Sequence, residues 1–349
     1  MRRPALLFPL AIGTLLATAG AYAQQPGLLV LNKSEATASL LSLADGRTVA
    51  TMPVGDGPHE IAVSPDGRWA MAANYGGTTP GHSLTLLDLR ARAAVRTIEL
   101  GEYRRPHGIA WLPDGKRVVV TSELAEAVIV VDAASGTIER AIKTGVGGTH
   151  LLVLSKDGTR VWTSNIFSGS NSLIDLATGT LVKTAPNGKG PEAIDLSPDG
   201  RELWTADRPL NRITVLDATT LDSLAAWPSG LFPNRLHFTP DGRTVLQSNA
   251  QSSTVDFYDA SKRSLAGRIT FPYDEALGKP TMLTQFGRSA TPLGILISPD
   301  GKTAWVALAA HDRLAEVDIA TRRVLRMLVA GREPDGMAYV PDIGTGKAP

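Results

Sequence analysis

A phrase of the form Ser-Pro-Asp-Gly recurs along the chain and strongly limits what the chain can fold into. Its Asp residues, with a truncated last copy at Val340-Pro341-Asp342, lie 48, 43, 42, 42, 59 and 42 residues apart. Spacing of this size is typical of the four-stranded blade of a β-propeller. Seven copies therefore predict seven blades. The full or near copies lie at 64–67, 112–115, 155–158, 197–200, 239–242 and 298–301.

Short β-branched runs stand between these turns. A run such as Ile61-Ala62-Val63 leads into the turn, whose Gly can adopt positive φ, and later runs such as Val130-Val131-Asp132 close on Asp. No helical periodicity of comparable length interrupts them. The fold class expected is all-β: a seven-bladed β-propeller with four-stranded blades.

The two ends of the chain are expected to share one blade. Residues 28–54 match the second, third and fourth strands of a blade, whereas residues 331–341 match only a first strand. Pairing these segments would close the ring and remove the exposed sheet edges that promote aggregation.

Residues 1–23 have the pattern of a cleavable export signal. Arg2 and Arg3 precede an apolar stretch, and Ala21-Tyr22-Ala23 supplies a small-x-small cleavage site before Gln24. The apolar stretch is too short to span a bilayer. We therefore expect a periplasmic protein whose mature part, residues 24–349, is a single propeller domain with no membrane segment.

Charge and cysteine content exclude several kinds of partner and cofactor. Without residues 1–23 the 35 basic residues become 33, against 34 acidic ones. This balance gives no general reason to expect nucleic acid or an anionic membrane as a partner. The sequence has no cysteine, which excludes a disulfide, a lipoprotein anchor, a covalently attached c-type haem and a thiolate metal site.

The repeats resemble the YVTN-repeat β-propellers, a family that includes the YncE-like periplasmic proteins. Trp162-Thr163-Ser164-Asn165 stands where that family has its naming tetrapeptide, and Ser-Pro-Asp-Gly is the family's usual turn. The resemblance covers nearly all of the chain after residue 23 and implies a periplasmic binding protein. Function is not implied by the fold alone, because propellers host binding proteins, lactonases, lyases and redox enzymes.

One column of residues has the chemistry of a metal site. Counting back seven residues from each turn Asp reaches an equivalent position in every blade, and these side chains should ring one mouth of the central channel. Three histidines and a carboxylate are suitable ligands for Zn, Fe, Mn, Ni or Cu. The alternative is that the loops only tolerate polar residues at a solvated rim. The column comprises His59, His107, His150, Glu192, Asn234, Leu293 and Asp335; the first four are the predicted ligands, and Asn234 and Asp335 are predicted ligand contacts.

A second polar set is expected on the same face, at the end of the second strand of each blade. Asn and Asp suit tight turns there, so most of the set is interpreted as structural, and Glu123 and Asp207 are the candidate ligand contacts. The set is Asn32, Asn74, Glu123, Asn165, Asp207 and Asn249. Arg105 and Arg235 could add anion contacts, and a long insertion at 271–290 is positioned to overhang the mouth.

Two functions follow from these patterns. The first is a binding protein that holds a small molecule or a protein partner at the channel mouth, with a metal as a possible component. The second is a metal-dependent lactonase, hydrolase or lyase that uses the His/His/His/Glu set. Haem d1 propellers of nitrite reductases are also similar, but their eight blades and attached cytochrome have no counterpart here.

Overall fold

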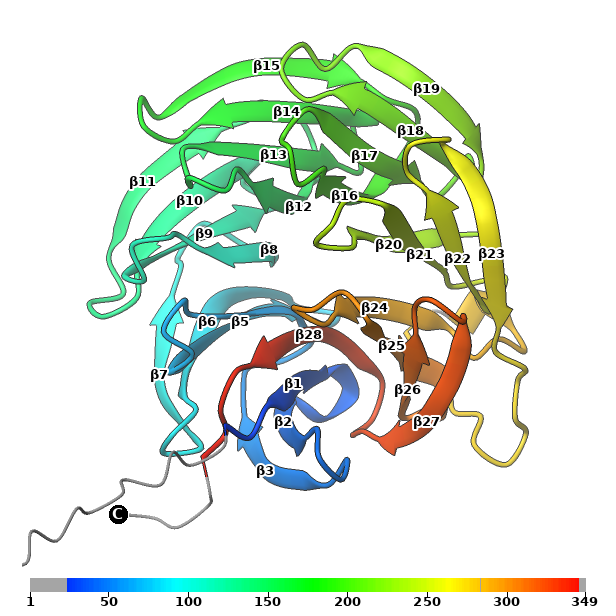
Figure 1. Cartoon of the computed structure of the whole chain (residues 1–349). Coiled ribbons are helices and arrows are strands. Elements are labelled where there is room, and N and C mark those ends of the chain that lie inside the picture. The colour runs from blue at the N-terminus through cyan, green and yellow to red at the C-terminus, as the bar shows by residue number, and fades with distance from the viewer. Residues whose placement is uncertain (1–23, 283, 345–349) are drawn as a thin grey trace, which may run out of the picture.

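The computed structural model describes residues 24–282 and 284–344, so the predicted signal segment 1–23 lies outside the described residues. The described residues form seven four-stranded antiparallel sheets, which Figure 1 shows as blades around a central axis. The predicted all-β, seven-bladed propeller is therefore confirmed. In the part of the chain that the structure describes, no helix has the length and apolar character needed to cross a membrane.

The innermost strand of each blade lines the channel, and each contacts the innermost strand of the next blade until the ring closes from β28 to β4. From blade 1 to blade 7 these strands are β4 (Pro58–Val63), β8 (Pro106–Trp111), β12 (Thr149–Leu154), β16 (Pro191–Leu196), β20 (Pro233–Phe238), β24 (Pro292–Ile297) and β28 (Pro334–Val340).

The second and third strands carry most of the core. In the same blade order, the second strands are β5 (Trp69–Gly76), β9 (Arg117–Ser122), β13 (Arg160–Asn165), β17 (Glu202–Asp207), β21 (Thr244–Asn249), β25 (Thr303–Leu308) and β1 (Gly27–Asn32). The third strands are β6 (Pro80–Asp88), β10 (Ala127–Asp132), β14 (Ser170–Asp175), β18 (Arg212–Asp217), β22 (Thr254–Asp259), β26 (Arg313–Asp318) and β2 (Thr37–Ser42).

The outermost strands form the rim of the disc and are the most exposed. They are β7 (Ala93–Glu99), β11 (Ile138–Lys143), β15 (Thr180–Pro186), β19 (Ser223–Pro228), β23 (Ser264–Thr270), β27 (Arg323–Val329) and β3 (Thr48–Pro53). Three short 3-10 helices complete the described elements: η1 (Lys33–Glu35), η2 (Thr284–Phe286) and η3 (Ala309–His311).

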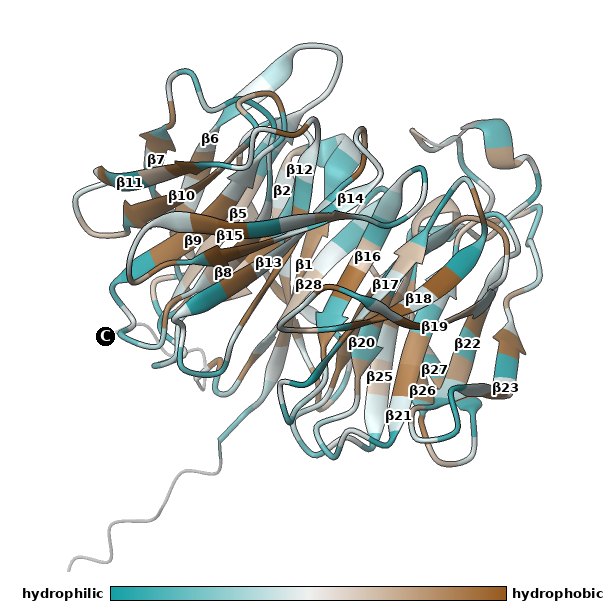
Figure 2. Cartoon of the chain, turned by 90° about the horizontal axis from the view of Figure 1, so that it is seen from above, coloured by the Kyte–Doolittle hydropathy of each residue, from teal (hydrophilic) through white to brown (hydrophobic). Residues whose placement is uncertain are grey.

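The core lies between neighbouring blades. In one cluster Met71 and Leu84 of blade 1 pack against Val118 and Ile129 of blade 2, and all four side chains are fully buried. Figure 2 shows apolar residues along the strands, with polar residues gathered in the loops that join them. Burying an aliphatic side chain of this size contributes about 1.5–3 kcal/mol, so the contacts between blades stabilise the ring.

The recurring turn shows why its sequence repeats. In the copy at 197–200, Ser197 Oγ donates a hydrogen bond to Asp199 Oδ1 over 2.6 Å, and the same carboxylate accepts one from the backbone N–H of Arg201. Gly200 has a φ of +74°, a conformation that a side chain would strain. Ser, Asp and Gly each therefore have a defined role in the hairpin.

Blade 7 confirms the predicted closure. Its innermost strand β28 comes from the C-terminal part of the chain and pairs antiparallel with β1, placing Val340 opposite Gly27. Strands β2 and β3 complete the same sheet. The backbone N–H of Ile343 donates to the carbonyl of Gln25 over 2.8 Å, so the two ends of the described chain lie side by side.

Candidate functional site

The predicted column occupies the second residue of every innermost strand. Because all seven strands run in the same direction relative to the channel, these residues form one ring at one mouth, named here the inner ring. Six of its members are buried and His59 is partly buried. The inner ring comprises His59, His107, His150, Glu192, Asn234, Leu293 and Asp335.

The three histidines are adjacent. The ring centroids of His59 and His107 are 5.1 Å apart, and those of His107 and His150 are 3.8 Å apart. They come from three consecutive blades, so the propeller geometry itself produces this stack.

A second ring lies at the same mouth. In each blade one residue of the second strand pairs with the first residue of the innermost strand, and the residue that comes directly after it belongs to this ring. The register pairs Pro58 with Asn74 and Pro106 with Ser122, so Tyr75 and Glu123 are equivalent to each other. The repeat pattern predicted Glu123 to be equivalent to the Asn residues, which is wrong by one position, because Ser122 stands there. This outer ring comprises Lys33, Tyr75, Glu123, Ile166, Arg208, Ala250 and Ala309.

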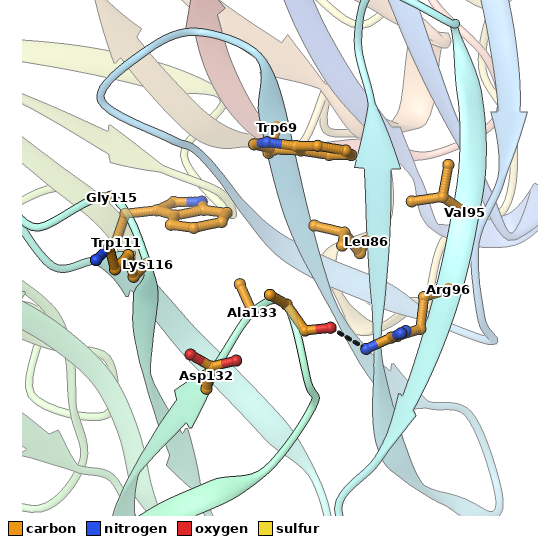
Figure 3. Close-up of a pocket in the computed structure, with 10 residues that line it drawn as sticks. Trp69, Leu86, Val95, Arg96, Trp111, Gly115, Lys116, Asp132 and Ala133 are labelled. Carbon is orange, nitrogen blue, oxygen red and sulfur yellow. Dashed lines mark hydrogen bonds between the residues drawn. The ribbon is translucent and has the colours of Figure 1, made fainter.

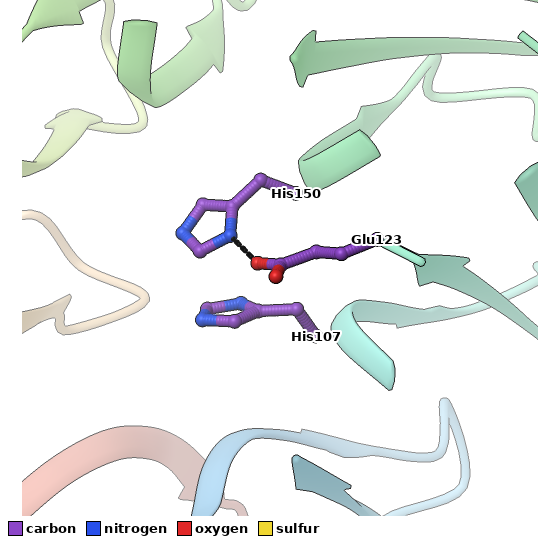
Figure 4. A group of neighbouring side chains, drawn as sticks. All are labelled: His107, Glu123 and His150. Carbon is purple, nitrogen blue, oxygen red and sulfur yellow. Dashed lines mark hydrogen bonds and ion pairs between the residues drawn. The ribbon is translucent and has the colours of Figure 1, made fainter. Parts of the chain in front are cut away.

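Four outer-ring side chains reach inward and pair with neighbours at the mouth. Glu123 is the central one: its Oε2 accepts a hydrogen bond from the Tyr75 hydroxyl over 2.8 Å, and its Oε1 contacts Nδ1 of His150. Figure 4 shows the imidazoles of His107 and His150 beside this carboxylate. Sequence reasoning missed Tyr75 and Lys33, although both follow the recurrent Asn at the end of the second strand.

His107, Glu123 and His150 form a candidate metal centre. One ligand atom from each lies within 4.8 Å of the others, and all three residues are buried. Ligands of a tetrahedral zinc ion are about 3.3 Å apart, as follows from Zn–N bonds of about 2.0–2.1 Å. Modest side-chain rotation would therefore bring the three groups to an ion.

His107 has the clearest character of a ligand in this cluster. Its Nδ1 atom is buried and has no hydrogen-bond partner among the described residues. Burial and the positive charge of His150 hold the pKa of His107 well below its usual range, so the ring is neutral and one of its nitrogens carries a lone pair. An orphaned polar atom in a buried site indicates a missing partner.

His150 lies between two carboxylates. Burial disfavours its charged form, but Glu192 and Glu123 outweigh burial and raise the pKa of His150 to about 9. Its Nε2 atom is 3.1 Å from Glu192 Oε1, without the angle of a hydrogen bond. The imidazole therefore carries a proton at neutral pH when nothing is bound, and a metal ion would have to replace that proton.

Glu192 is held as an anion by cations on two sides. Arg208 lies 3.0 Å from its Oε2 and Arg235 lies 3.1 Å from its Oε1. Burial would raise its pKa, but Arg208, His150 and Arg235 together hold the pKa of Glu192 well below its usual range. Glu192 lies outside the group of atoms that converge on one ion, so its observed contacts support His150 rather than complete the ligand set.

Arg235 crosses the channel just inside the mouth. Its Nε donates to Glu60 Oε1 over 3.0 Å, and another of its nitrogens contacts the same oxygen. Glu60 belongs to blade 1 and Arg235 to blade 5, so the pair spans the ring. Beyond it the channel opens into a cavity of about 190 Å³ lined mainly by aliphatic residues.

Asp335 of the inner ring and Lys33 of the outer ring belong to a second charged cluster. Lys33 lies 3.2 Å from Asp335 Oδ2 and 3.7 Å from Glu333, and all three are buried. Burial and the charge of Lys33 lower the pKa of His59 to about 3. Its Nδ1 is 2.7 Å from the carbonyl of Gly57, so Nδ1 carries the hydrogen and Nε2 the lone pair. His59 is not among the converging ligand atoms.

The other predicted contacts have partners in the protein. Asn234 donates to Glu192 over 3.3 Å, and Arg105 stacks 4.5 Å from the Tyr75 ring centroid. The oxygens of Asp207 accept hydrogen bonds from the backbone N–H groups of Lys189, Gly190 and Leu210. Asp207 thus fixes a loop, as the Asn residues of its set do.

The insertion contacts residues at the mouth. The Phe286 ring packs 4.5 Å from Phe232, which directly precedes β20, and the backbone N–H of Met282 donates to Glu333 over 2.8 Å. Arg208 lies 5.1 Å from the Phe232 ring centroid. The segment therefore packs beside both rings, as the sequence predicted.

Comparison with known proteins agrees with this fold. Hydrazine synthase from Kuenenia stuttgartiensis is similar in structure, with a TM-score of 0.70 and 18% identity over 88% of this chain and 99% of that chain. Identity this low supports the fold alone. No curated protein sequence matches the chain.

The sequence model of one family, described as lactonase, 7-bladed beta-propeller, matches residues 55–276. The match starts just before blade 1, runs through blade 5 into the insertion, and includes all three residues of the candidate metal centre. More than half of the chain lies within it. The chain therefore belongs to the seven-bladed β-propeller lactonase family.

Proposed function

We propose that this protein is a ligand-binding propeller whose channel mouth holds a divalent transition metal ion on His107, Glu123 and His150. The orphaned Nδ1 of His107, buried beside a carboxylate and a second imidazole, is the observation that carries the proposal. Two imidazoles and one carboxylate suit Zn, Fe, Mn, Ni or Cu. The metal would leave coordination positions facing the mouth for a small-molecule ligand.

The surrounding residues would orient the ligands. Tyr75 donates to the Glu123 oxygen that does not face His150, and Glu192 lies on the far side of the His150 ring. Partners of this kind fix ligand orientation and raise ligand basicity, and their loss typically costs about 10–100-fold in metal affinity.

Metal analysis of the mature, untagged protein tests the proposal. About one equivalent of metal should co-purify or be taken up on dialysis against each of the five ions, and His107→Ala should lose it. His82→Ala is the matched control, because His82 is exposed and pairs with Glu99 on the rim. A wild-type protein that takes up none of the five ions, or a His107→Ala variant that retains the metal, would overturn the proposal.

Lactone hydrolysis is the second candidate function, and family membership favours it. A metal bound here would polarise the lactone carbonyl. Water adds to the carbonyl carbon and gives up a proton to solvent, the ring C–O bond breaks, and the released alkoxide oxygen takes up a proton. In metal-free protein His150 holds a proton at neutral pH and could donate it, whereas a metal on His150 would leave that role to another acid. Assays with a lactone panel, on metal-free and metal-loaded protein, separate these cases.

The propeller repeats and the predicted export signal support a place among the YVTN-repeat, YncE-like periplasmic propellers. Cell fractionation followed by mass spectrometry of the purified protein tests this placement. A chain beginning at Gln24 in the periplasmic fraction is expected, and full-length protein in the cytoplasm would refute it.

A further inference from the structure

A second hollow lies between blades 1 and 2, at the end of the innermost strands away from the histidines. Its volume is about 540 Å³, and Trp69, Trp111, Leu86 and Val95 supply apolar walls (Figure 3). Strand β8 carries His107 near its start and Trp111 at its end, so this pocket and the metal centre lie on opposite faces. A volume of about 300–1,000 Å³ is typical of small-molecule sites.

Comparison among the blades shows that Trp69 is exceptional. It is the first residue of the second strand of blade 1, and the other blades have no aromatic side chain there. Most of them carry polar residues, which suits a position close to solvent. An indole at this position is therefore not required by the blade repeat. The equivalent residues are Arg117, Arg160, Glu202, Thr244, Thr303 and Gly27.

Trp111 and Ala133 together open the space beside Trp69. Trp111 ends β8, at a position that holds Val, Leu, Phe, Ile or Tyr in the other blades, and its Nε1 donates to the carbonyl of Ala62 over 3.0 Å, which fixes the indole. Ala133 follows β10, and the equivalent residue in blade 3 is Leu176. A small side chain opposite two indoles leaves a flat, aromatic-walled hollow.

The rim of the pocket is cationic. Arg96 and Lys116 line it and are exposed, and Arg96 also contacts the carbonyl of Ala134. The Arg68 guanidinium, which pairs with Asp88, lies 4.5 Å from the Trp69 ring centroid. Asp132 is the one acidic residue among those lining the pocket, and its Oδ1 already accepts hydrogen bonds from the N–H and Oγ of Ser135. The rim therefore favours an anionic group on the ligand.

We propose that this pocket binds a planar aromatic carboxylate, with the rings against Trp69 and Trp111 and the carboxylate at Lys116 and Arg96. Stacked or edge-on aromatic contacts supply affinity beyond area burial, and the rim cations select the acid over its neutral analogue. This site is independent of the metal centre and of the activity proposed for it.

Titration calorimetry with 2-naphthoate, and with neutral 2-naphthol as the uncharged probe, tests the proposal. Lys116→Glu should weaken 2-naphthoate binding about fivefold while changing 2-naphthol by less than about twofold. Lys302→Glu is the matched control, because Lys302 holds the equivalent turn position in blade 6 and should leave both probes unaffected.

Two further variants test the aromatic wall. Trp69→Thr places the residue of blades 5 and 6 in blade 1 and should weaken both probes about tenfold. Ala133→Leu keeps both indoles but fills the hollow with the residue of blade 3, and should abolish binding while the melting temperature is maintained. Absence of saturable 2-naphthoate binding to the wild type, or binding unchanged in both variants, would overturn the proposal.

Discussion

At the scale of the residue, the chemistry of the channel mouth depends on the side chain that follows the last paired residue of the second strand. In most blades the preceding position holds Asn or Asp, which ties the loop together: Asn74 donates to Ser83 and Thr85 over 3.0 Å and accepts from the N–H of Gly55. Glu123, one position later, points to His150 instead. Two neighbouring positions in the repeat thus separate a structural role from a candidate functional one.

Replacing Glu123 should alter the titration of His150. Glu123→Gln removes one of the two carboxylates that raise the pKa of His150 to about 9, so this pKa should fall by about one pH unit or more in metal-free protein. NMR titration of the His150 ring measures it. An unchanged pKa of His150 would show that Glu123 does not set its charge.

Asp207→Ala should destabilise the fold without changing the mouth chemistry. The variant leaves the backbone N–H groups of Lys189, Gly190 and Leu210 without their acceptor. We expect a loss of about 3 kcal/mol, because unsatisfied buried donors cost about 1–3 kcal/mol each. Urea unfolding measures the loss. Unchanged stability together with lost metal binding would instead place Asp207 in the site.

At the scale of the element, the turn between the first and second strands is a repeated acid-sensitive unit. Hydrogen bonds from Ser155 and from the backbone N–H of Thr159 lower the pKa of Asp157 to about 2. The equivalent Asp66, Asp114, Asp199, Asp241 and Asp300 have pKa values shifted in the same direction. The pKa of the turn Asp is therefore lowered in six blades.

Acid should destabilise the propeller over the pH range in which the carboxylates of these turns become protonated. A carboxyl whose pKa is lower in the folded state stabilises the fold above its unfolded pKa of about 3.9, and this stabilisation is lost as the pH falls through the folded value. Unfolding measured from pH 5 to about 2.5 should show a steep loss of stability. Asp157→Asn should make the dependence shallower, and a parallel pH profile would contradict the assignment.

At the scale of the whole molecule, closure depends on one strand supplied by the C-terminal part of the chain. Strand β28 pairs with β1 inside blade 7 and contacts β24 and β4 of the adjacent blades. It also carries Asp335, the partner of Lys33 on β1's side of the mouth. The fold and the mouth therefore both need the two ends of the chain together.

Removing residues 333–349 should prevent closure. The truncated chain would expose the edge of β1 and the surfaces of β4 and β24 that β28 covers, and we expect aggregation instead of a cooperative unfolding transition. A circular permutant that joins the adjacent ends and opens the exposed loop at Lys262 keeps β28 in place and should fold. Light scattering and circular dichroism compare the two. A monomeric, cooperatively folded truncation would show that closure is dispensable.

The sequence by itself determined the blade number, the shared blade and the inner ring, because a fixed repeat places equivalent residues at equivalent positions around an axis. His59, His107, His150 and Glu192 could be brought to one mouth on that basis alone. Only the tertiary structure decided which of them converge. His107 and His150 meet Glu123, whereas His59 lies against Tyr75 and His107 without joining the converging ligand atoms.

The reason is that these pairings depend on side-chain direction and on contacts between distant blades. Glu60 and Arg235 are 175 residues apart in sequence and meet across the channel, and no local pattern encodes that contact. The same holds for the pocket between Trp69 and Trp111, whose shape results from packing two blades together. A repeat determines where residues stand, and the packed ring determines which of them touch.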